Sequence, residues 1–181
     1  MAKPTQSLAL DLKKAAVLSL GYQLRQLSFF PEDFQKVIIA NTNQVLEKAR
    51  QDGIYIIHIE AVFGERTPEN AIHPAMEPKA GEPLLTKYRV GPFSTTNLDE
   101  LLKQHQIDTL VLMGMRTMGV VLNTVRCATD MGYKVIVISD CCADQDEELH
   151  RVLMAKVIPF TATVMNSADF FNLVEKAKGN N

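Results

Sequence analysis

Five short apolar runs constrain the fold of this chain more than any other feature of its sequence. They span residues 15–20, 54–60, 109–113, 134–139 and 161–165, and most are rich in Val, Ile and Leu without polar alternation. This pattern is typical of strands whose sheet is covered on both faces, as parallel sheets are. The runs therefore predict a buried parallel sheet.

Helical patterns lie between these runs. Pro31 opens the longest, since proline suits a first helical turn, and Gly53 closes it. Its predicted buried face consists of Phe34, Val37, Ile38, Val45, Leu46 and Ala49. Later helices are predicted to begin after a capping box at residues 96–99 and at the caps Asp144 and Ser167. Alternating strands and helices indicate the α/β class, a doubly wound parallel sheet with helices on both faces.

The topology predicts where a ligand binds. In such sheets the pocket lies beyond the carboxyl ends of the strands, where the winding reverses. We place the reversal between the strands at 15–20 and 109–113, which brings residues 21–23 and 114–119 together. Residues 62–88 form a long segment with four prolines, and we interpret it as a pocket wall or an oligomer contact.

Composition narrows the class of partner. A chain of 181 residues fits a single domain, spanning 1–181. The net charge of −2 gives no electrostatic reason to expect nucleic acid or an anionic membrane as a partner. No apolar run approaches the ~20 residues of a membrane span. The first residues lack a signal-peptide core, and three cysteines make no disulfide framework, so we expect a cytoplasmic location.

Three stretches resemble one known family. Residues 15–23 resemble its opening strand, which normally ends in Asp followed by a Gln; residues 87–98 resemble its lysine motif. Residues 114–124 resemble its nucleophile loop and the helix that follows. The chain is thus similar to the isochorismatase-like cysteine hydrolase superfamily, which includes isochorismatases and nicotinamidases. The resemblance implies a Rossmann-type three-layer sandwich and a homo-oligomer.

The resemblance also assigns a catalytic set of Asp, Lys and Cys. Only Lys87 is retained here, because Gly21 stands at the Asp position and Gly119 at the Cys position. True isochorismatases resemble this chain in carrying Gly at the Cys position, since vinyl-ether hydrolysis needs protonation and water. They still need the Asp, and loss of a general acid typically slows a reaction 10²–10⁴-fold. The family reaction is therefore not expected.

The same loops supply the expected ligand contacts. We place Tyr22, Phe93, Met115, Arg116 and Met118 at the ligand, with a packed aromatic as the alternative for Tyr22. The resemblance implies a non-proline cis peptide between Met115 and Arg116. An unpaired Lys87 together with the helix beginning near Thr117 would form an anion site.

Other reactive side chains receive structural interpretations. Cys127 lies eight residues beyond Gly119 on one predicted helix, ~12 Å along its axis, too far to replace the nucleophile. Adjacent Cys141 and Cys142 are interpreted as buried rather than as a redox pair. His58 and Glu60 share a strand face, but the following loop lacks the nicotinamidase metal pattern, so we expect no metal and no cofactor.

Three functional hypotheses remain. The first is a hydrolase-fold protein, degenerate for family chemistry, that binds a small ligand near Lys87, with an anion as the favoured class. The second is an active hydrolase with a rearranged mechanism that uses Lys87 and an activated water. The third is an oligomeric scaffold that binds a partner through residues 62–88.

Overall fold

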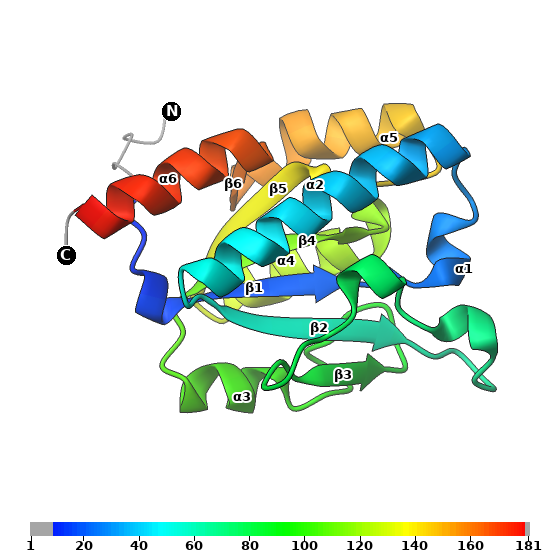
Figure 1. The fold of residues 1–181 in the computed structure, drawn as a ribbon, viewed down its shortest axis with the longest axis horizontal. Coiled ribbons are helices and arrows are strands. Elements are labelled where there is room, and N and C mark those ends of the chain that lie inside the picture. The colour runs from blue at the N-terminus through cyan, green and yellow to red at the C-terminus, as the bar shows by residue number, and fades with distance from the viewer. Residues whose placement is uncertain (1–8, 180–181) are drawn as a thin grey trace.

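A computed structural model describes residues 9–179 and shows a parallel sheet between two layers of helices (Figure 1). Within these residues the sheet has six strands in the order β3-β2-β1-β4-β5-β6, all paired in parallel. The strands are β1 Ala15–Leu20, β2 Tyr55–Ala61, β3 Leu84–Lys87, β4 Thr109–Met115, β5 Lys134–Ala143 and β6 Thr163–Met165. Strand β1 pairs with both β2 and β4, so the winding reverses where the sequence predicted.

The strand boundaries differ from the prediction in four ways. Strand β2 spans Tyr55–Ala61 rather than residues 54–60, one residue later at each end. Strands β4 and β5 continue past the predicted ends, to Met115 and Ala143, and β6 begins two residues late, at Thr163. Strand β3 was missed, because this four-residue edge strand lies in the proline-rich segment interpreted as a loop. A strand this short, paired on one side only, leaves little periodicity to detect.

The helices are α1 Leu24–Leu27, α2 Glu32–Gln51, α3 Leu98–Gln104, α4 Leu122–Asp130, α5 Glu147–Val152 and α6 Ser167–Gly179. Short 3₁₀ turns are η1 Leu12–Lys14, η2 Pro68–Asn70, η3 Pro74–Met76 and η6 Ile158–Phe160, and π-helical turns are η4 Thr117–Val121 and η5 Leu153–Val157. No described helix is long and apolar enough to cross a membrane.

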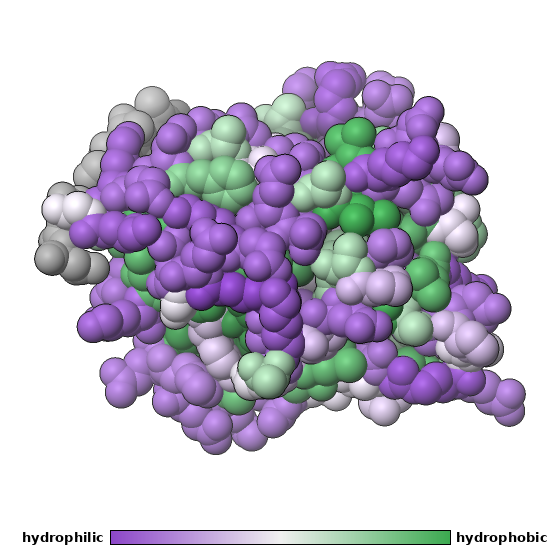
Figure 2. Space-filling model, in the orientation of Figure 1, coloured by the Kyte–Doolittle hydropathy of each residue, from purple (hydrophilic) through white to green (hydrophobic). Residues whose placement is uncertain are grey.

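Two cores sandwich the sheet. Alternate strand residues such as Val17 and Val111 pack with α2 and α6 on one face. Their neighbours Leu18 and Leu112 pack with α3 and α4 on the other face. All four are fully buried, which explains why the strands show no polar alternation. Figure 2 shows the outer surface of the α2 face as mostly hydrophilic, with hydrophobic residues interspersed toward the carboxyl ends of the strands.

The apolar face of α2 is narrower than predicted. Ile38, Val45, Leu46 and Ala49 are buried, whereas Phe34 and Val37 are 41% and 59% exposed. Both exposed residues lie in the first two turns of the helix, and Phe34 stacks on Phe30 rather than entering the core.

Three predicted helix caps are wrong in detail. No capping box forms at residues 96–99, because Asn97 is the N-cap of α3 without a side-chain hydrogen bond and the Thr96 hydroxyl accepts from the Leu98 N–H. The other two caps lie one or two residues from their predicted positions. Asp146, not Asp144, accepts a hydrogen bond from the Leu149 N–H at the start of α5. Asp144 instead accepts one from the Met118 N–H, 2.7 Å away. At α6, Asn166 accepts from the Asp169 N–H, while the Ser167 hydroxyl donates to Asp140. In both cases a neighbouring polar residue forms the cap, which leaves the predicted one free for a tertiary contact.

Candidate functional site

A cavity of about 190 Å³ opens at the carboxyl ends of the central strands. Gly21 follows β1, Ala61 ends β2, Lys87 ends β3 and Met115 ends β4, so four neighbouring strands converge on it. The lining residues are Gly21, Gln23, Gln26, Ala61, Phe63, Lys87, Val90, Met115, Arg116, Gly119 and Val120. The structure therefore brings together Lys87, Gly21 and Gly119, the three positions at which the resemblance places the catalytic set.

Lys87 lies against this cavity with its charge poorly compensated. It is 4% exposed, and its Nζ donates a hydrogen bond to the Arg89 carbonyl oxygen at 3.0 Å. The ammonium also lies 4.9 Å from the centre of the Phe63 ring. Within residues 9–179 no carboxylate forms an ion pair with it. Burial lowers the pKa of Lys87 from 10.5 to about 8.

Gly21 occupies a backbone conformation that a side chain does not fit. Its φ is +74°, in the left-handed region that favours glycine. A Cβ added there would lie 2.7 Å from the Met115 carbonyl oxygen. The backbone at position 21 would therefore have to shift before this position could carry an aspartate.

Position 119, unlike position 21, has space for a side chain. A Cβ added there would meet nothing within 4 Å, and the residue lies in the π-helical turn η4 that leads into α4. The space that a thiol would occupy is thus open to the cavity.

Met115 and Arg116 line the cavity, and the peptide bond between them is cis, as the resemblance implied. The Arg116 guanidinium lies 5.4 Å from the centre of the Phe29 ring. Arg116 and Lys87 are the two ionisable groups among the described lining residues, and both are cations.

Three predicted ligand contacts lie elsewhere. Tyr22 is 1% exposed in the core and donates a hydrogen bond to the Cys141 carbonyl oxygen, as a packed aromatic would. Burial raises the pKa of its hydroxyl well above the usual value. Phe93 packs beside Tyr133 under α3 and α4, and Met118 is 56% exposed outside the cavity. The burial of Tyr22 follows from the alternation of side chains along an extended backbone, since its side chain points to the opposite side of the chain from Gly21 and Gln23.

The predicted anion site at the start of the helix also needs correction. The Met118 N–H is already bonded to Asp144, and the Gly119 N–H donates to the Arg116 carbonyl oxygen at 3.1 Å. These two amides are therefore occupied, and any anion would depend on Lys87 and Arg116.

Several lining residues were not predicted as ligand contacts, and Gln23, which lies in the segment 21–23 expected at the pocket, is the most constrained of them. Its side-chain amide donates to the Ala61 and Asn70 carbonyl oxygens, and its Oε1 accepts from the Ala61 N–H. These hydrogen bonds hold the segment that follows β1 against the end of β2. Ala61 and Phe63 lie at or just beyond the end of β2, and Val90 and Val120 lie in the quoted motifs, which is the signal that could have found them. Gln26 lies in α1, outside those motifs, and carried no such signal.

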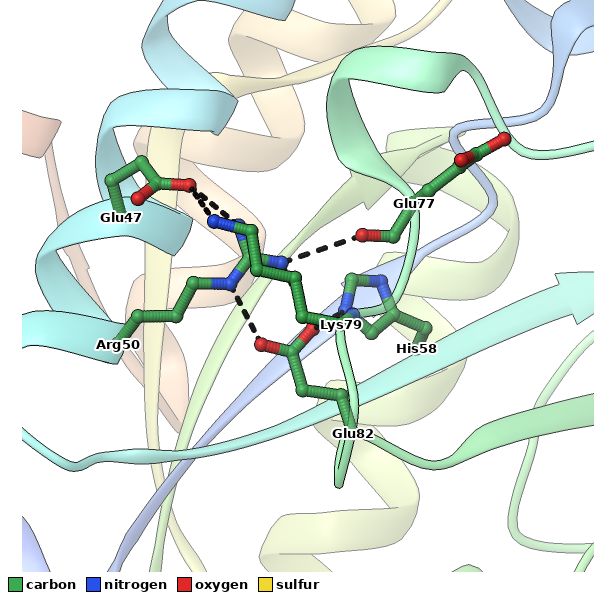
Figure 3. A network of polar contacts seen from close by, with 6 residues as sticks. All are labelled: Glu47, Arg50, His58, Glu77, Lys79 and Glu82. Carbon is green, nitrogen blue, oxygen red and sulfur yellow. Dashed lines mark hydrogen bonds and ion pairs between the residues drawn. The ribbon is translucent and has the colours of Figure 1, made fainter.

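The residues weighed for metal binding have other partners. His58 is buried and its Nε2 lies 2.8 Å from Glu82 in a network that includes Arg50, Glu47 and Lys79 (Figure 3). Burial lowers the pKa of His58. Glu60 is buried too, and it bonds to Arg66 and to the Thr86 hydroxyl.

His73 is half-buried, and its Nδ1 accepts from the Ala75 N–H. Among residues 9–179 no group of three or more His, Cys, Asp or Glu side chains is placed to hold a metal ion. The ion-pair network instead ties residues 77–82 to α2 and β2.

The cysteines fit structural roles. Cys141 and Cys142 are 0% and 4% exposed and form no disulfide. Burial raises the pKa of both thiols, that of Cys142 to about 12, so neither is a ready nucleophile. Cys127 is half-buried on α4, where its thiol contacts Asn123.

A doubly wound parallel sheet with a cavity at the carboxyl ends of its strands, beside a buried lysine, places this chain among the doubly wound α/β proteins with a ligand-sized cavity. Comparisons with known proteins identify the family. Residues 24–169 match the Isochorismatase domain. The chain is 30% identical over 142 residues to a "Secreted isochorismatase effector Isc1" of Verticillium dahliae, across 71% of this chain and 75% of the relative.

Solved structures agree. An isochorismatase-like hydrolase from Alkaliphilus metalliredigens shares 27% identity with a TM-score of 0.79, over 88% of this chain and 98% of its own. A cysteine hydrolase from Pseudomonas syringae has a TM-score of 0.87 at 19% identity, over 98% and 100% of the two chains, which shows the same fold. The chain belongs to the isochorismatase family.

Proposed function

We propose that this chain binds a small anionic ligand in the cavity beside Lys87 and does not perform the thiol or vinyl-ether chemistry of its family. One observation carries the proposal. The described cavity lining contains two cations, Lys87 and Arg116, and no carboxylate, imidazole, hydroxyl or thiol.

The two halves of this proposal have separate physical reasons. A buried ammonium without a carboxylate partner is unfavourable, and an anion bound beside it would relieve that cost. Hydrolysis requires a group that moves a proton or attacks the substrate, and glycines at positions 21 and 119 offer neither. The alternative mechanism, in which Lys87 activates a water, lacks a second group to receive or return the proton.

Thermal-shift and calorimetric titration with benzoate, acetate and phosphate test the binding half. We expect at least one of these anions to raise the melting temperature of the wild type but not of Lys87→Met. Lys36→Met is the matched control, because the side chain of Lys36 is 73% exposed on α2. If no anion binds, or if Lys87→Met binds as well as the wild type, the site assignment fails.

A substrate screen tests the other half. Isochorismate, small amides and small esters should show no turnover above background with the wild type. Turnover that Lys87→Met abolishes would instead establish the rearranged hydrolase. If the wild type neither binds an anion nor turns over a substrate, the remaining hypothesis is a scaffold that binds a partner through residues 62–88.

A further inference from the structure

We propose that Lys87 is a covalent attachment site, at which its amine forms a reversible imine with a small aldehyde or ketone that carries a carboxylate. The inference rests on the proposed function, because the same cavity and the same cation receive the ligand. It goes further by naming the ligand's reactive group.

The position of Lys87 supports a nucleophilic role. Strand pairing fixes the backbone of Lys87. Ala61 of β2 is its partner in the sheet, and the Lys87 carbonyl oxygen accepts a hydrogen bond from the Val62 N–H at 3.0 Å. The side chain ends against the face of Phe63, in a cavity whose described lining holds no carboxylate. A lysine that is held in this way has a carbonyl oxygen and an aromatic ring beside its amine, but no carboxylate that would hold it in the protonated form.

The protonation state agrees with this geometry. With its pKa lowered to about 8 by burial, Lys87 is neutral in about a fifth of molecules at pH 7.4. An ordinary lysine is neutral in roughly 0.1% of molecules at that pH. Amines desolvated in this way are the ones that form Schiff bases. A neutral amine can still donate one N–H to the Arg89 carbonyl oxygen while its lone pair attacks a carbonyl carbon.

The cavity has space for the carbonyl carbon and a partner for its carboxylate. Gly119 contributes no side chain, and nothing lies within 4 Å of where its Cβ would be. Arg116 lines the same cavity, and guanidinium groups bind carboxylates with well-defined geometry. A ligand with a carbonyl at one end and a carboxylate at the other would thus meet Lys87 and Arg116 respectively.

The chemistry needs no reagent beyond water and solvent protons. The Lys87 nitrogen forms a bond to the carbonyl carbon, and the C=O π electrons move to oxygen, which takes up a proton while nitrogen loses one. The nitrogen lone pair then expels the hydroxyl group of the carbinolamine as water, with a proton from solvent, and the resulting protonated imine returns its nitrogen proton to solvent to give the neutral imine. Because the described lining supplies no acid to speed this dehydration, we expect a slow, reversible adduct rather than turnover.

Reductive trapping tests the inference. Wild-type protein is incubated at pH 7.4 with glyoxylate and sodium cyanoborohydride, which reduces the imine to a stable carboxymethyl amine that peptide mass spectrometry locates. Lys87 should be modified at least about tenfold faster than the exposed Lys36, since its larger neutral fraction outweighs its lower basicity. Lys87→Met should lose this fast modification, and Lys36→Met should keep it.

Two further arms keep the test decisive if Lys87→Met folds poorly. Bound benzoate should slow modification of Lys87 in the wild type. Arg116→Gln should slow trapping of glyoxylate at Lys87 but leave trapping of formaldehyde, which has no carboxylate, unchanged.

The outcomes separate the two proposals. If Lys87 is modified no faster than Lys36 while benzoate still binds the wild type, the imine is refuted and the anion-binding function stands. If benzoate does not bind either, both are refuted.

Discussion

Replacing Lys87 with methionine should make the protein's stability less dependent on pH between 7 and 10. Methionine keeps the unbranched shape of lysine but has no charge to bury. The pKa of Lys87 is about 8 in the folded protein and 10.5 when unperturbed, so the unfolded chain binds more protons in this interval. Wild-type stability therefore rises with pH from about 8 to 10.5 and carries the full penalty below pH 8.

The magnitude follows from the size of this interval. At about 1.4 kcal/mol per pH unit, burying the ammonium costs the folded state about 3 kcal/mol at pH 7. The stability of Lys87→Met relative to the wild type should decline by about 2–3 kcal/mol between pH 7 and pH 10. Loss of the hydrogen bond to the Arg89 carbonyl oxygen, worth about 1 kcal/mol, shifts the difference at every pH because the neutral amine also donates it.

Urea unfolding measured by far-UV circular dichroism gives these differences, since the chain has no tryptophan to report by fluorescence. Other groups titrate equally in both proteins and cancel in the difference. Lys36→Met, at an exposed position, should show a difference that does not vary with pH. If the stability difference between Lys87→Met and the wild type is the same at pH 7 and pH 10, burial of the ammonium does not destabilise the folded protein and the reasoning about the cavity is wrong.

Four other predictions follow from the site. Benzoate affinity should be constant below pH 8 and fall up to about tenfold per pH unit above it, as calorimetry at pH 7, 8 and 9 would show, because the free ammonium deprotonates there. Gly21→Asp should lower stability by at least about 1 kcal/mol more than Gly81→Asp in urea unfolding, since both have positive φ but only position 21 clashes with Met115; equal losses would contradict the clash. Gly119→Cys should fold normally and react with iodoacetamide faster than Cys127, and equal rates would place position 119 outside the cavity. Tyr22→Phe should cost about 1 kcal/mol in urea unfolding but leave benzoate affinity unchanged, whereas weaker binding would return Tyr22 to the site.

Much of the fold could be predicted because burial on both faces leaves a direct trace in the sequence. The apolar runs at β1 and β4 located the centre of the sheet, and the reversal between them located the cavity. Strand β3 left no such trace, since the first three of its four residues at the edge of the sheet are exposed or half-buried. Its last residue, Lys87, was identified by a motif rather than by periodicity.

The site was harder to predict, because side-chain direction decides which residues meet a ligand. Tyr22 is adjacent to two lining residues yet points into the core, where its hydroxyl meets the Cys141 carbonyl oxygen. Phe63 was only part of a long segment interpreted as a wall, and its contact with Lys87 depends on how residues 62–88 fold back. Asp144 was expected to cap its own helix, but its bond to Met118 joins segments 26 residues apart.

Because the carbonyl oxygen of Met115 lies beside Gly21, positions 21 and 119 differ in how readily each could acquire a side chain by mutation. Position 119 can regain a side chain in a single substitution, whereas position 21 must first rotate its backbone away from its neighbour. A descendant of this protein could therefore recover a nucleophile long before it recovered an acid. Any hydrolytic activity that arose by that route would have to obtain its proton from the substrate or from solvent.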